Sequence, residues 1–413
     1  MIMQLRPILS SLSHHKLTAS LLMLQVALTC AIVCNVVFMI ANRVEQVTLP
    51  SGVDEAGLSM LNSESIDKSE NRLARHAADL AGLRAVPGVT AAVAVDTLPL
   101  GRDESSYGTC ASAEDLAKAI AARSMMRDGL CVQPAVYGGT QGEVGALGLH
   151  LIAGRDFRAD EYVAGSDVHV AILSRALAEK LYPGKDALGQ SVYAGGAKPI
   201  RVIGIVDTLL RPHLRAPEVN QYAMLFPMLP NDGEVTYLLR SAPQDRERVL
   251  RMAAEKLQQL SPERIIPASG MRTYAQMREA YFQRDTTMIG LLLASGFGLL
   301  FVTALGITGL ANFWVQQRRR SIGIRRAIGA TRGDTLRYFQ TENFLIVSGG
   351  IALGTLLAFV LNAALMTQYE LPRLPWHYLP IGALVLWGLG QLAVLGPALR
   401  AAAVPPVVAT QSV

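Results

Sequence analysis

The sequence predicts a membrane α-helical protein with four transmembrane helices and an α+β extracytoplasmic domain inserted between the first two. Three observations support this fold class. The 413 residues are 51% apolar and 17% charged, which places the chain between soluble and fully membrane-embedded proteins. Four stretches without a charged side chain exceed the roughly 20 residues that a helix needs to cross a bilayer. The segment between the first two stretches is too long for a loop and has the composition of a folded domain.

The four uncharged stretches, the third of which runs from Asn343 to Tyr369, predict the transmembrane helices. We assign these helices to residues 17–42, 286–317, 341–369 and 378–399. The first stretch could instead be the apolar core of a signal peptide. Its apolar run is longer than the 7 to 15 residues of such a core, and no small-x-small cleavage site stands out before Arg43. We therefore expect an uncleaved membrane anchor.

Basic residues in the short loops predict the orientation, because they are retained on the cytoplasmic side. Arg6 and Lys16 lie in the leader, residues 1–16. The segment 318–340 has a single acid, Asp334, and seven arginines: Arg318, Arg319, Arg320, Arg325, Arg326, Arg332 and Arg337. We expect both termini, including the tail 400–413, to be cytoplasmic, with residues 43–285 and the short loop 370–377 outside. The net charge of +5 then reflects topology, and we do not interpret it as a nucleic-acid-binding surface.

The inserted segment 43–285 shows both helical and strand patterns. Ser174 is expected to cap a helix that reaches Tyr182. A last stretch, with Met271, Tyr274, Met277 and Tyr281 at helical spacing, predicts a stalk helix that continues into the second transmembrane helix. The other expected elements are a helix at Arg72–Leu83, strands at Val89–Val95, His169–Leu173 and Ile200–Val206, and a helix within Pro243–Leu260. Glycine pairs such as Gly195–Gly196 are interpreted as turn formers rather than ligand contacts.

Cysteine positions agree with this topology. Cys110 and Cys131 lie in the inserted domain, where an oxidising compartment would allow a disulfide that closes a loop of about 20 residues and stabilises by about 3 kcal/mol. Cys30 and Cys34 share a face of the first transmembrane helix, a spacing that could bind a metal. Thiols inside lipid usually behave as small apolar groups, so we assign no metal site.

The chain lacks the motifs of an enzyme. It contains no phosphate-binding P-loop, no Cys and His cluster at zinc spacing and no Gly-x-Ser-x-Gly elbow, so we assign no catalytic residue. The uncharged stretches also lack the acidic, His or Arg side chains that ion-coupled carriers use. Glu342, at the inner edge of the third helix, is expected to pair with a nearby arginine. A partner must therefore supply energy for any work across the membrane.

The segment after the second transmembrane helix is where such a partner could dock. Gln316–Ile328 predicts a basic helix that continues from the second transmembrane helix, with Ile322 and Ile324 among its apolar members. Gly329 would end it, and Thr331 with Asp334 has the form of a capping box that would start the third helix. The predicted structure is a short rigid elbow. From charge alone, an ordinary membrane anchor explains these arginines equally well.

This same segment, Arg319 to Thr331 (RRSIGIRRAIGAT), followed by QTENFL at Gln340–Leu345, resembles the signature of MacB/FtsX-type ABC transporter permeases. The family usually has an acidic residue where this chain has Ser321. In that family the segment forms the coupling helix that contacts the ATPase subunit. The resemblance implies that the ATPase-coupling residues are Arg319, Arg320, Ile322, Gly323, Ile324, Arg325, Arg326, Ala327, Gly329, Ala330 and Thr331.

The inserted domain carries a second resemblance, to the MacB periplasmic core domain. The segments that carry it are GRDF at Gly154–Phe157, VAILSRALAEKLYPG at Val170–Gly184, LGQ at Leu188–Gln190 and RVIGIV at Arg201–Val206. Residues 101–133, which contain both cysteines of the domain, match no part of it.

Together the resemblances imply a permease subunit of the bacterial inner membrane with its large domain in the periplasm. Such a subunit passes the movement of a separate ATPase to the periplasmic domain and so exports or extracts a substrate by mechanotransmission. ATP and Mg would bind the ATPase, and no cofactor would bind this chain. Implied partners are that ATPase, a second permease, the same or different, that forms a dimer, and in some members a periplasmic adaptor and an outer-membrane channel. The alternatives are an FtsX-like regulator of a periplasmic partner such as a cell-wall hydrolase, and an ATPase-independent sensor or scaffold.

Overall fold

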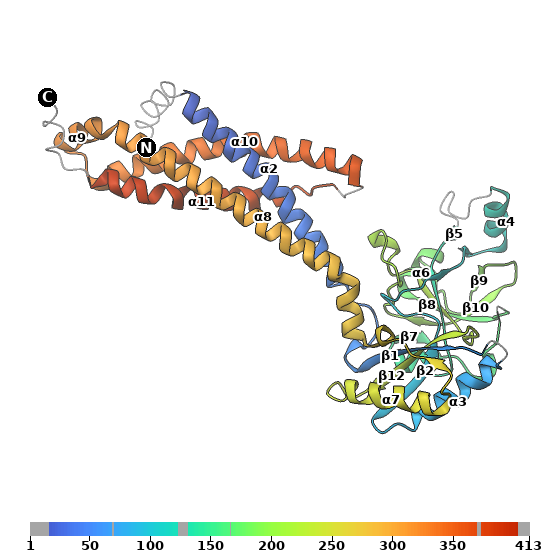
Figure 1. Ribbon diagram of the computed structural model, residues 1–413. Helices are drawn as coiled ribbons and strands as arrows, with labels where there is room; N and C mark the ends of the chain where they lie inside the picture. Colours follow the sequence, from blue (N-terminus) through green and yellow to red (C-terminus); the bar gives the residue numbers. More distant parts are fainter. Residues whose placement is uncertain (1–15, 68–69, 123–130, 166, 370–372, 404–413) are drawn as a thin grey trace. The chain divides into compact units, whose positions relative to one another are not determined.

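The computed structural model describes residues 16–67, 70–122, 131–165, 167–369 and 373–403 (Figure 1). It divides into two compact units. The helical unit consists of Met1–Thr48 and Arg284–Val413, and the inserted domain is Leu49–Gln283. Most of the predicted leader and tail, and part of the loop 370–377, lie outside the described residues.

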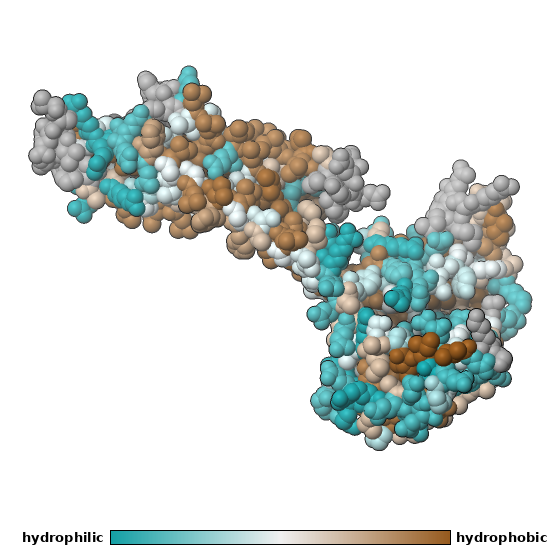
Figure 2. Space-filling model, in the orientation of Figure 1, coloured by the Kyte–Doolittle hydropathy of each residue, from teal (hydrophilic) through white to brown (hydrophobic). Residues whose placement is uncertain are grey.

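Four helices in the described chain are long and apolar enough to cross a membrane, as the sequence predicts. The structure gives them longer bounds than the uncharged stretches alone. They are α2 (Lys16–Val47), α8 (Tyr274–Gln317), α10 (Arg332–Tyr369) and α11 (Tyr378–Ala402), and the short α9 (Arg319–Ala327) lies between α8 and α10. Figure 2 shows that hydrophobic residues dominate the surface of the helical unit and hydrophilic residues that of the inserted domain.

Small residues allow α2 to pack closely against its neighbours. A Cβ atom on Gly354 of α10 would lie 2.5 Å from the Cβ of Cys30, and one on Gly382 of α11 would collide with the Cys34 sulfur. Both thiols are free and buried. Close approach through small residues is a common way for helices to associate in lipid. The two cysteines are therefore packing groups in this helix bundle.

The first sheet of the inserted domain has the order β13-β1-β12-β2, with β14 also paired to β1, and its pairs are antiparallel. Helices α3 and α7 pack against it and against each other (Figure 1). The strands are β1 (Leu58–Ser65), β2 (Val89–Val95), β12 (Glu234–Ser241), β13 (Arg264–Ile265) and β14 (Met271–Thr273), and the helices are α3 (Arg72–Arg84) and α7 (Arg246–Leu260).

The second sheet is mixed, with the order β3-β6-β11-β8-β10-β9-β4-β5 and with β7 also paired to β10. Its parallel pairs are β8 with β10 and β6 with β11. The strands are β3 (Ser105–Ser106), β4 (Thr109–Cys110), β5 (Cys131–Val132), β6 (Ala135–Gly138), β7 (Leu151–Gly154), β8 (Val170–Ser174), β9 (Ser191–Ala194), β10 (Ile200–Val206) and β11 (Ala223–Phe226). The remaining short helices of the inserted domain are α4 (Ala113–Ala121), α5 (Glu143–Leu147) and α6 (Arg175–Leu181), with short 3-10 turns at Glu55–Gly57, Ala159–Glu161, Pro217–Val219 and Ala268–Gly270.

The local predictions for the inserted domain are largely confirmed. Strands β2 and β10 have the predicted bounds, and the Ser174 hydroxyl accepts a hydrogen bond from the Leu177 amide at the start of α6. The prediction for Met271 is wrong. This residue lies in β14, opposite Leu61 of β1, and the stalk helix α8 begins only at Tyr274 because the preceding residues complete the sheet.

Residues 101–133 form β3, β4, α4 and β5, apart from 123–130, which lie outside the described residues. A disulfide joins Cys110 and Cys131, the pair that the sequence singles out. The two residues are directly opposite each other in the antiparallel β4–β5 pair, with their Cα atoms 4.4 Å apart. The bond therefore fastens the base of α4 to the end of the second sheet.

Candidate functional site

The predicted elbow is the segment 318–340. The part of it that turns, residues 318–331 (hereafter the elbow), contains the separate helix α9. Sequence reasoning predicted one helix over Gln316–Ile328, but α8 ends at Gln317 and α9 begins at Arg319. Between them Arg318 leaves helical geometry, with φ −100° and ψ 9°. Its side chain explains the break, because Arg318 Nη1 lies 3.0 Å from both carboxylate oxygens of Glu342 on α10.

The Arg318–Glu342 pair anchors the junction of α8 and α9. Glu342 is buried, and the Arg318 guanidinium also lies 6.0 Å from the centre of the Trp314 ring. This confirms the prediction that Glu342 pairs with a nearby arginine. Removing one partner of a buried ion pair is costly, since the other charge is left uncompensated. The pair therefore holds the elbow in one position relative to α10.

Gly329 ends α9 in a Schellman motif. The Gly329 amide donates to Arg326 O at 3.2 Å and the Ala330 amide to Arg325 O at 3.1 Å. Gly329 has φ +112°, a conformation that suits glycine and strains other residues. The predicted break at Gly329 is confirmed.

The predicted capping box starts α10. Thr331 Oγ1 accepts from the Asp334 amide at 3.1 Å, and an Asp334 carboxylate oxygen accepts from the Thr331 amide at 3.1 Å. This hydrogen bonding also lowers the pKa of Asp334. The end of α9 and the start of α10 are thus both capped, which makes the connection between the two helices a rigid turn rather than a loose loop.

The elbow has one buried and one exposed face. Ile322 and Gly323 are buried, and Ile322 belongs to the apolar core of the helical unit. On the other side, 44% of Ile324 and 82% of Ile328 are accessible to solvent. Arg319 and Arg320 are exposed beside them. This face combines apolar and cationic groups, the composition that suits a partner surface with an apolar hollow and acidic residues.

The structure brings the predicted coupling residues together on one turn, but they differ in their exposure to solvent. Exposed members are Arg319, Arg320, Ile324, Arg325, Ala327, Gly329 and Thr331, half-buried members are Arg326 and Ala330, and Ile322 and Gly323 are buried. Arg325 lies over the ring of Tyr338 on α10, 5.1 Å from its centre. Sequence reasoning missed Trp314 and Tyr338 as supports of the arginines, because no local pattern links an arginine to an aromatic residue in a later turn.

The inserted domain holds the first turns of α8 through both sheets. The Tyr274 hydroxyl donates to Pro99 O, which follows β2, at 2.8 Å. Arg278 donates to Glu55 and to Leu49 O, each at 2.6 Å. The Tyr281 hydroxyl accepts from the Leu214 amide, which follows β10, at 2.9 Å. Movement of this part of α8 would therefore displace segments that are attached to both sheets of the domain.

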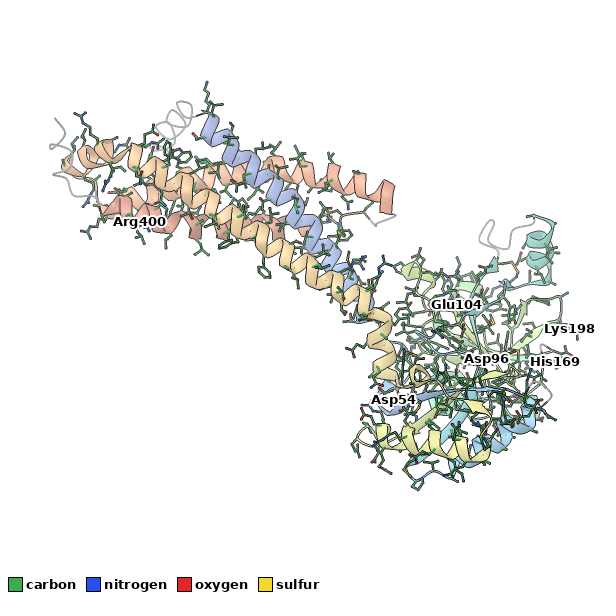
Figure 3. The ribbon with its side chains drawn as sticks, in the orientation of Figure 1. Asp54, Asp96, Glu104, His169, Lys198 and Arg400 are labelled. Atoms are coloured by element: carbon green, nitrogen blue, oxygen red, sulfur yellow. A yellow bond between two sulfur atoms is a disulfide. The ribbon has the colours of Figure 1, made fainter. Side chains whose placement is uncertain are left out.

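The loop that contacts Tyr281 is itself fixed by a buried carboxylate, Glu104 (Figure 3). Glu104 forms ion pairs with buried Arg211 and with Arg215, and accepts from the His213 amide at 3.0 Å. Burial alone would raise the pKa of Glu104, but the hydrogen bonds from Arg211 and His213 outweigh it and lower the pKa. The loop is thus a firm contact for the base of α8.

Among the described residues, no group of three or more His, Cys, Asp or Glu side chains is placed to hold a metal ion.

Two family models match the chain. The FtsX-like permease C-terminal model matches residues 288–406, which include the whole elbow, and the MacB-like periplasmic core domain model matches residues 21–228. The chain is 25% identical over 279 residues to the uncharacterized ABC transporter permease YknZ of Bacillus subtilis, covering 66% of this chain and 68% of YknZ. It is 26% identical over 230 residues to the macrolide export ATP-binding/permease protein MacB of Escherichia coli, covering 52% of this chain but only 33% of MacB.

Solved structures that are similar to this chain include the following two domains. The extracellular domain of YknZ is 18% identical, with a TM-score of 0.32, and the match covers 50% of this chain and 99% of that domain. The periplasmic region of MacB from Actinobacillus actinomycetemcomitans is 13% identical, with a TM-score of 0.34, and the match covers 57% of this chain and 97% of that region.

Proposed function

Because the chain belongs to the ABC transporter permeases with a MacB-like periplasmic core domain and an FtsX-like permease domain, we propose that it works by mechanotransmission. A separate ATPase subunit hydrolyses ATP and moves the elbow. The helical unit passes this movement to the inserted domain, which then exports or extracts a substrate. In this proposal the protein lies in the inner membrane with both termini in the cytoplasm, and its inserted domain lies in the periplasm.

The elbow is the observation that carries the proposal. A docking helix must keep its orientation under load. Helix α9 is anchored at its start by the pair of Arg318 with the buried Glu342, and it ends in the Gly329 cap, directly before the capping box of α10. Its exposed Ile324 and Ile328, flanked by arginines, provide an apolar and cationic contact surface for an ATPase. An ordinary anchor of arginines would not need exposed isoleucines or a Schellman cap.

Helix α8 supports the second step, the transmission of movement. It is unbroken over the 44 residues from Tyr274 to Gln317, a length of about 66 Å at 1.5 Å per residue. One end carries the contacts of Tyr274, Arg278 and Tyr281 with both sheets of the inserted domain, and the other end leads directly into the elbow. A continuous helix transmits axial and tilting movement without needing a substrate path through the bilayer.

A second permease, the same or different, would cover α8. Only 6% of the most apolar part of α8 is buried, compared with 56% for α2. Its exposed large side chains include Phe297, Phe301 and Leu305, which follow each other at four-residue spacing on one face. We propose that this face contacts the second permease of a dimer.

The test is to purify the full-length protein with the ATPase that binds it and to measure association and ATP hydrolysis. Arg319→Glu combined with Arg320→Glu reverses two exposed charges without touching the buried pair. We expect at least tenfold weaker association, and Ile328→Ala should weaken it independently. Arg400→Glu, an exposed arginine outside the elbow, is the matched control and should bind as the unchanged protein does.

If the ATPase binds the elbow variants normally, the elbow is only a membrane anchor and the proposal is wrong. If the protein binds an ATPase and its inserted domain binds a cell-wall hydrolase, the results would instead support an FtsX-like regulator. If no ATPase binds the unchanged protein, a sensor or scaffold becomes the better account.

A further inference from the structure

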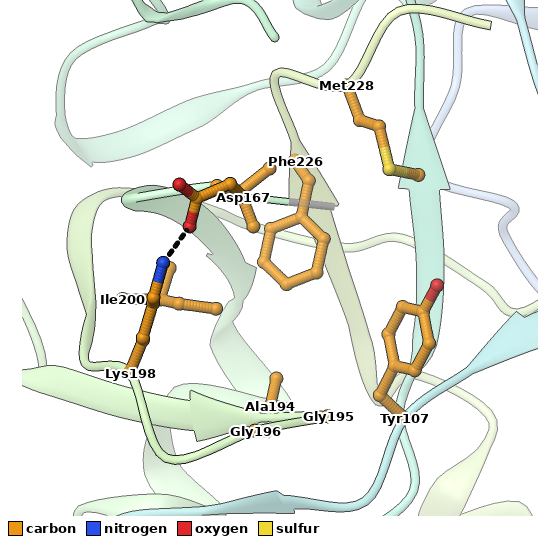
Figure 4. Close-up of a pocket in the computed structure, with 10 residues that line it drawn as sticks. Tyr107, Asp167, Ala194, Gly195, Gly196, Lys198, Ile200, Phe226 and Met228 are labelled. Carbon is orange, nitrogen blue, oxygen red and sulfur yellow. Dashed lines mark hydrogen bonds and ion pairs between the residues drawn. The ribbon is translucent and has the colours of Figure 1, made fainter. Parts of the chain in front are cut away.

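The inserted domain contains a cavity of about 650 Å³ at one end of the second sheet (Figure 4). Its walls come from the turn between β9 and β10, the residues before β8, the end of β11 and the segment between β3 and β4. Pockets that bury a small ligand typically measure about 300–1,000 Å³. The volume therefore suits a ligand of drug or dipeptide size.

The floor of the cavity is apolar. Val168, Ile200 and Phe226 line it, and each exposes less than a tenth of its surface. These residues also belong to the core of the second sheet, so their positions do not depend on a ligand. A group that enters the cavity meets a preformed apolar surface, and burying its own apolar surface there favours binding.

One wall is the ring of Tyr107, which lies in residues 101–133. Sequence reasoning found no resemblance there, but the match to the MacB-like periplasmic core domain runs from residue 21 to 228 and includes this segment, so that expectation was wrong. The Thr109 hydroxyl donates to Tyr107 O at 3.0 Å, and Thr109 in β4 pairs with Ala194 in β9. The next residue, Cys110, carries the disulfide. The disulfide-fastened strand thus keeps an aromatic ring at the mouth of the cavity, which assigns a role to this segment.

The glycine turn facing Tyr107 leaves the cavity open. Gly195 has φ +66°, and a Cβ atom there would approach the Tyr107 ring to 3.4 Å, so the interpretation as a turn former holds for it. Gly196 differs, because its φ is not in the left-handed region and an added Cβ would meet nothing within 4 Å. Neither backbone conformation nor crowding requires glycine at position 196. A side chain there would project at the rim of the cavity.

The rim carries one charge of each sign. Lys198 Nζ donates to Asp167 at 2.7 Å, and this hydrogen bond lowers the pKa of Asp167. Since the two charges already pair with each other, a ligand with a net charge would have to compete with the existing pair. A neutral or zwitterionic ligand meets no such cost, and can use the Tyr107 hydroxyl and the backbone of the glycine turn for hydrogen bonds.

We propose that this cavity is a binding site for a neutral or zwitterionic amphiphile, whose aromatic or other apolar part lies on the floor formed by Val168, Ile200 and Phe226. The binding itself does not depend on the proposed function. Its identification as the site for the transported molecule does rest on that function.

The test uses the full-length protein in detergent and saturation-transfer NMR with N-acetyl-phenylalaninamide, a soluble neutral probe with one aromatic ring. We expect saturable transfer to the ring protons. Gly196→Phe adds a large side chain at the rim of the cavity without backbone strain and should weaken binding at least tenfold, and Tyr107→Ala should weaken it several-fold. Gly233→Phe is the matched control, because Gly233 also has open space around it but lies outside the cavity.

Probe charge and ring are tested separately. N-acetyl-glycinamide lacks the ring and should not bind, and N-acetyl-phenylalanine, which is an anion, should bind several-fold more weakly. Transfer that does not saturate, or that is equal in Gly196→Phe, reflects the detergent and overturns the proposal. If N-acetyl-phenylalanine binds more tightly than N-acetyl-phenylalaninamide, the proposal that the ligand is neutral or zwitterionic is wrong.

These measurements need neither ATP nor an ATPase, so their failure is distinct from a failure of the elbow experiment. The transport role is tested afterwards, by whether the probe changes ATP hydrolysis of the assembled complex. A change that Gly196→Phe abolishes and Gly233→Phe preserves assigns the cavity to the transported molecule. If the probe does not change ATP hydrolysis by the complex that contains the unsubstituted protein, the transport role is wrong and only the binding site remains.

Discussion

Replacing Asp96 with asparagine tests a cluster of acids in the inserted domain, in which Asp96 is half-buried and Glu143 is buried (Figure 3). Asp96 follows β2, and its amide donates to Gly138 O of β6 at 2.9 Å. Burial, and then repulsion from Asp232, raise the pKa of Asp96 to about 7. Glu143 is fully buried, and among the described residues neither of its carboxylate oxygens has a hydrogen-bond partner. Its pKa is raised by burial first and then by Asp96 and Asp156.

The sign of the pH dependence follows from these pKa values. In the unfolded chain Asp96 titrates near its usual 3.8, whereas in the folded domain it titrates near 7. Between these values only the folded state holds the proton, so stability falls as pH rises from about 4 to about 7 and stays level above it. At about 1.4 kcal/mol for each pH unit, the loss from Asp96 is at most about 4 kcal/mol.

Asparagine resembles the protonated acid and cannot ionise. Asp96→Asn should therefore match the unchanged protein at pH 4 and exceed it by up to about 4 kcal/mol at pH 8. Hydrogen exchange of the β2 amides in the full-length protein, corrected for the intrinsic pH dependence of exchange, measures the free energy of local opening. Asp160→Asn, at an exposed aspartate, is the control. A variant that is less stable at pH 8, or equally changed at both pH values, would refute the reasoning.

Three further changes follow from buried or strained groups, and each is read by local hydrogen exchange. Asp79→Ala leaves Arg264 buried without its two 2.8 Å hydrogen bonds, and should lower the stability of the first sheet by about 3–5 kcal/mol. Replacing Cys110 and Cys131 with serine should destabilise β4 and α4 by about 3 kcal/mol and leave the first sheet unchanged. Gly329→Ala forces a side chain into φ +112° and should loosen the end of α9 by about 1–2 kcal/mol.

Matched changes separate these effects from general damage. Asp245→Ala removes the exposed pair with Arg248 and should cost less than about 1 kcal/mol, so an equal loss would contradict the reasoning for Asp79. Faster exchange throughout the domain would contradict a local role of the disulfide. Gly333→Ala lies in the first turn of α10, where alanine is favoured by about 1 kcal/mol. If it loosens the elbow as much as Gly329→Ala, backbone strain is not the cause.

Much of the fold followed from local patterns. The bounds of β2 and β10, the Ser174 cap and the Thr331 capping box were all predictable, because each depends on residues within a few positions of one another. The position of Met271 was not, since its side-chain spacing suits a helix while its backbone completes a sheet with β1. Pairing with a strand about two hundred residues earlier overrides a local preference.

The candidate site also has features that the sequence predicted and features that only the structure revealed. The sequence identified the elbow, its glycine stop and the need of Glu342 for an arginine partner. It did not identify Arg318 as that partner, the break that the pair imposes between α8 and α9, or the supporting ring of Tyr338. It also assigned Ile322 and Ile324 to one apolar group, whereas the structure buries the first and exposes the second.

By itself the sequence determined where the chain can enter a bilayer, because hydrocarbon excludes charge and the uncharged stretches stand out without any knowledge of the fold. It also determined the caps and turns, whose hydrogen bonds close within one helical turn. Only the tertiary structure decided which face of α9 is free, which acids lie near the buried Glu143 and which strands enclose the cavity. These features join side chains far apart in the chain, and their burial depends on packing that no spacing along the sequence encodes.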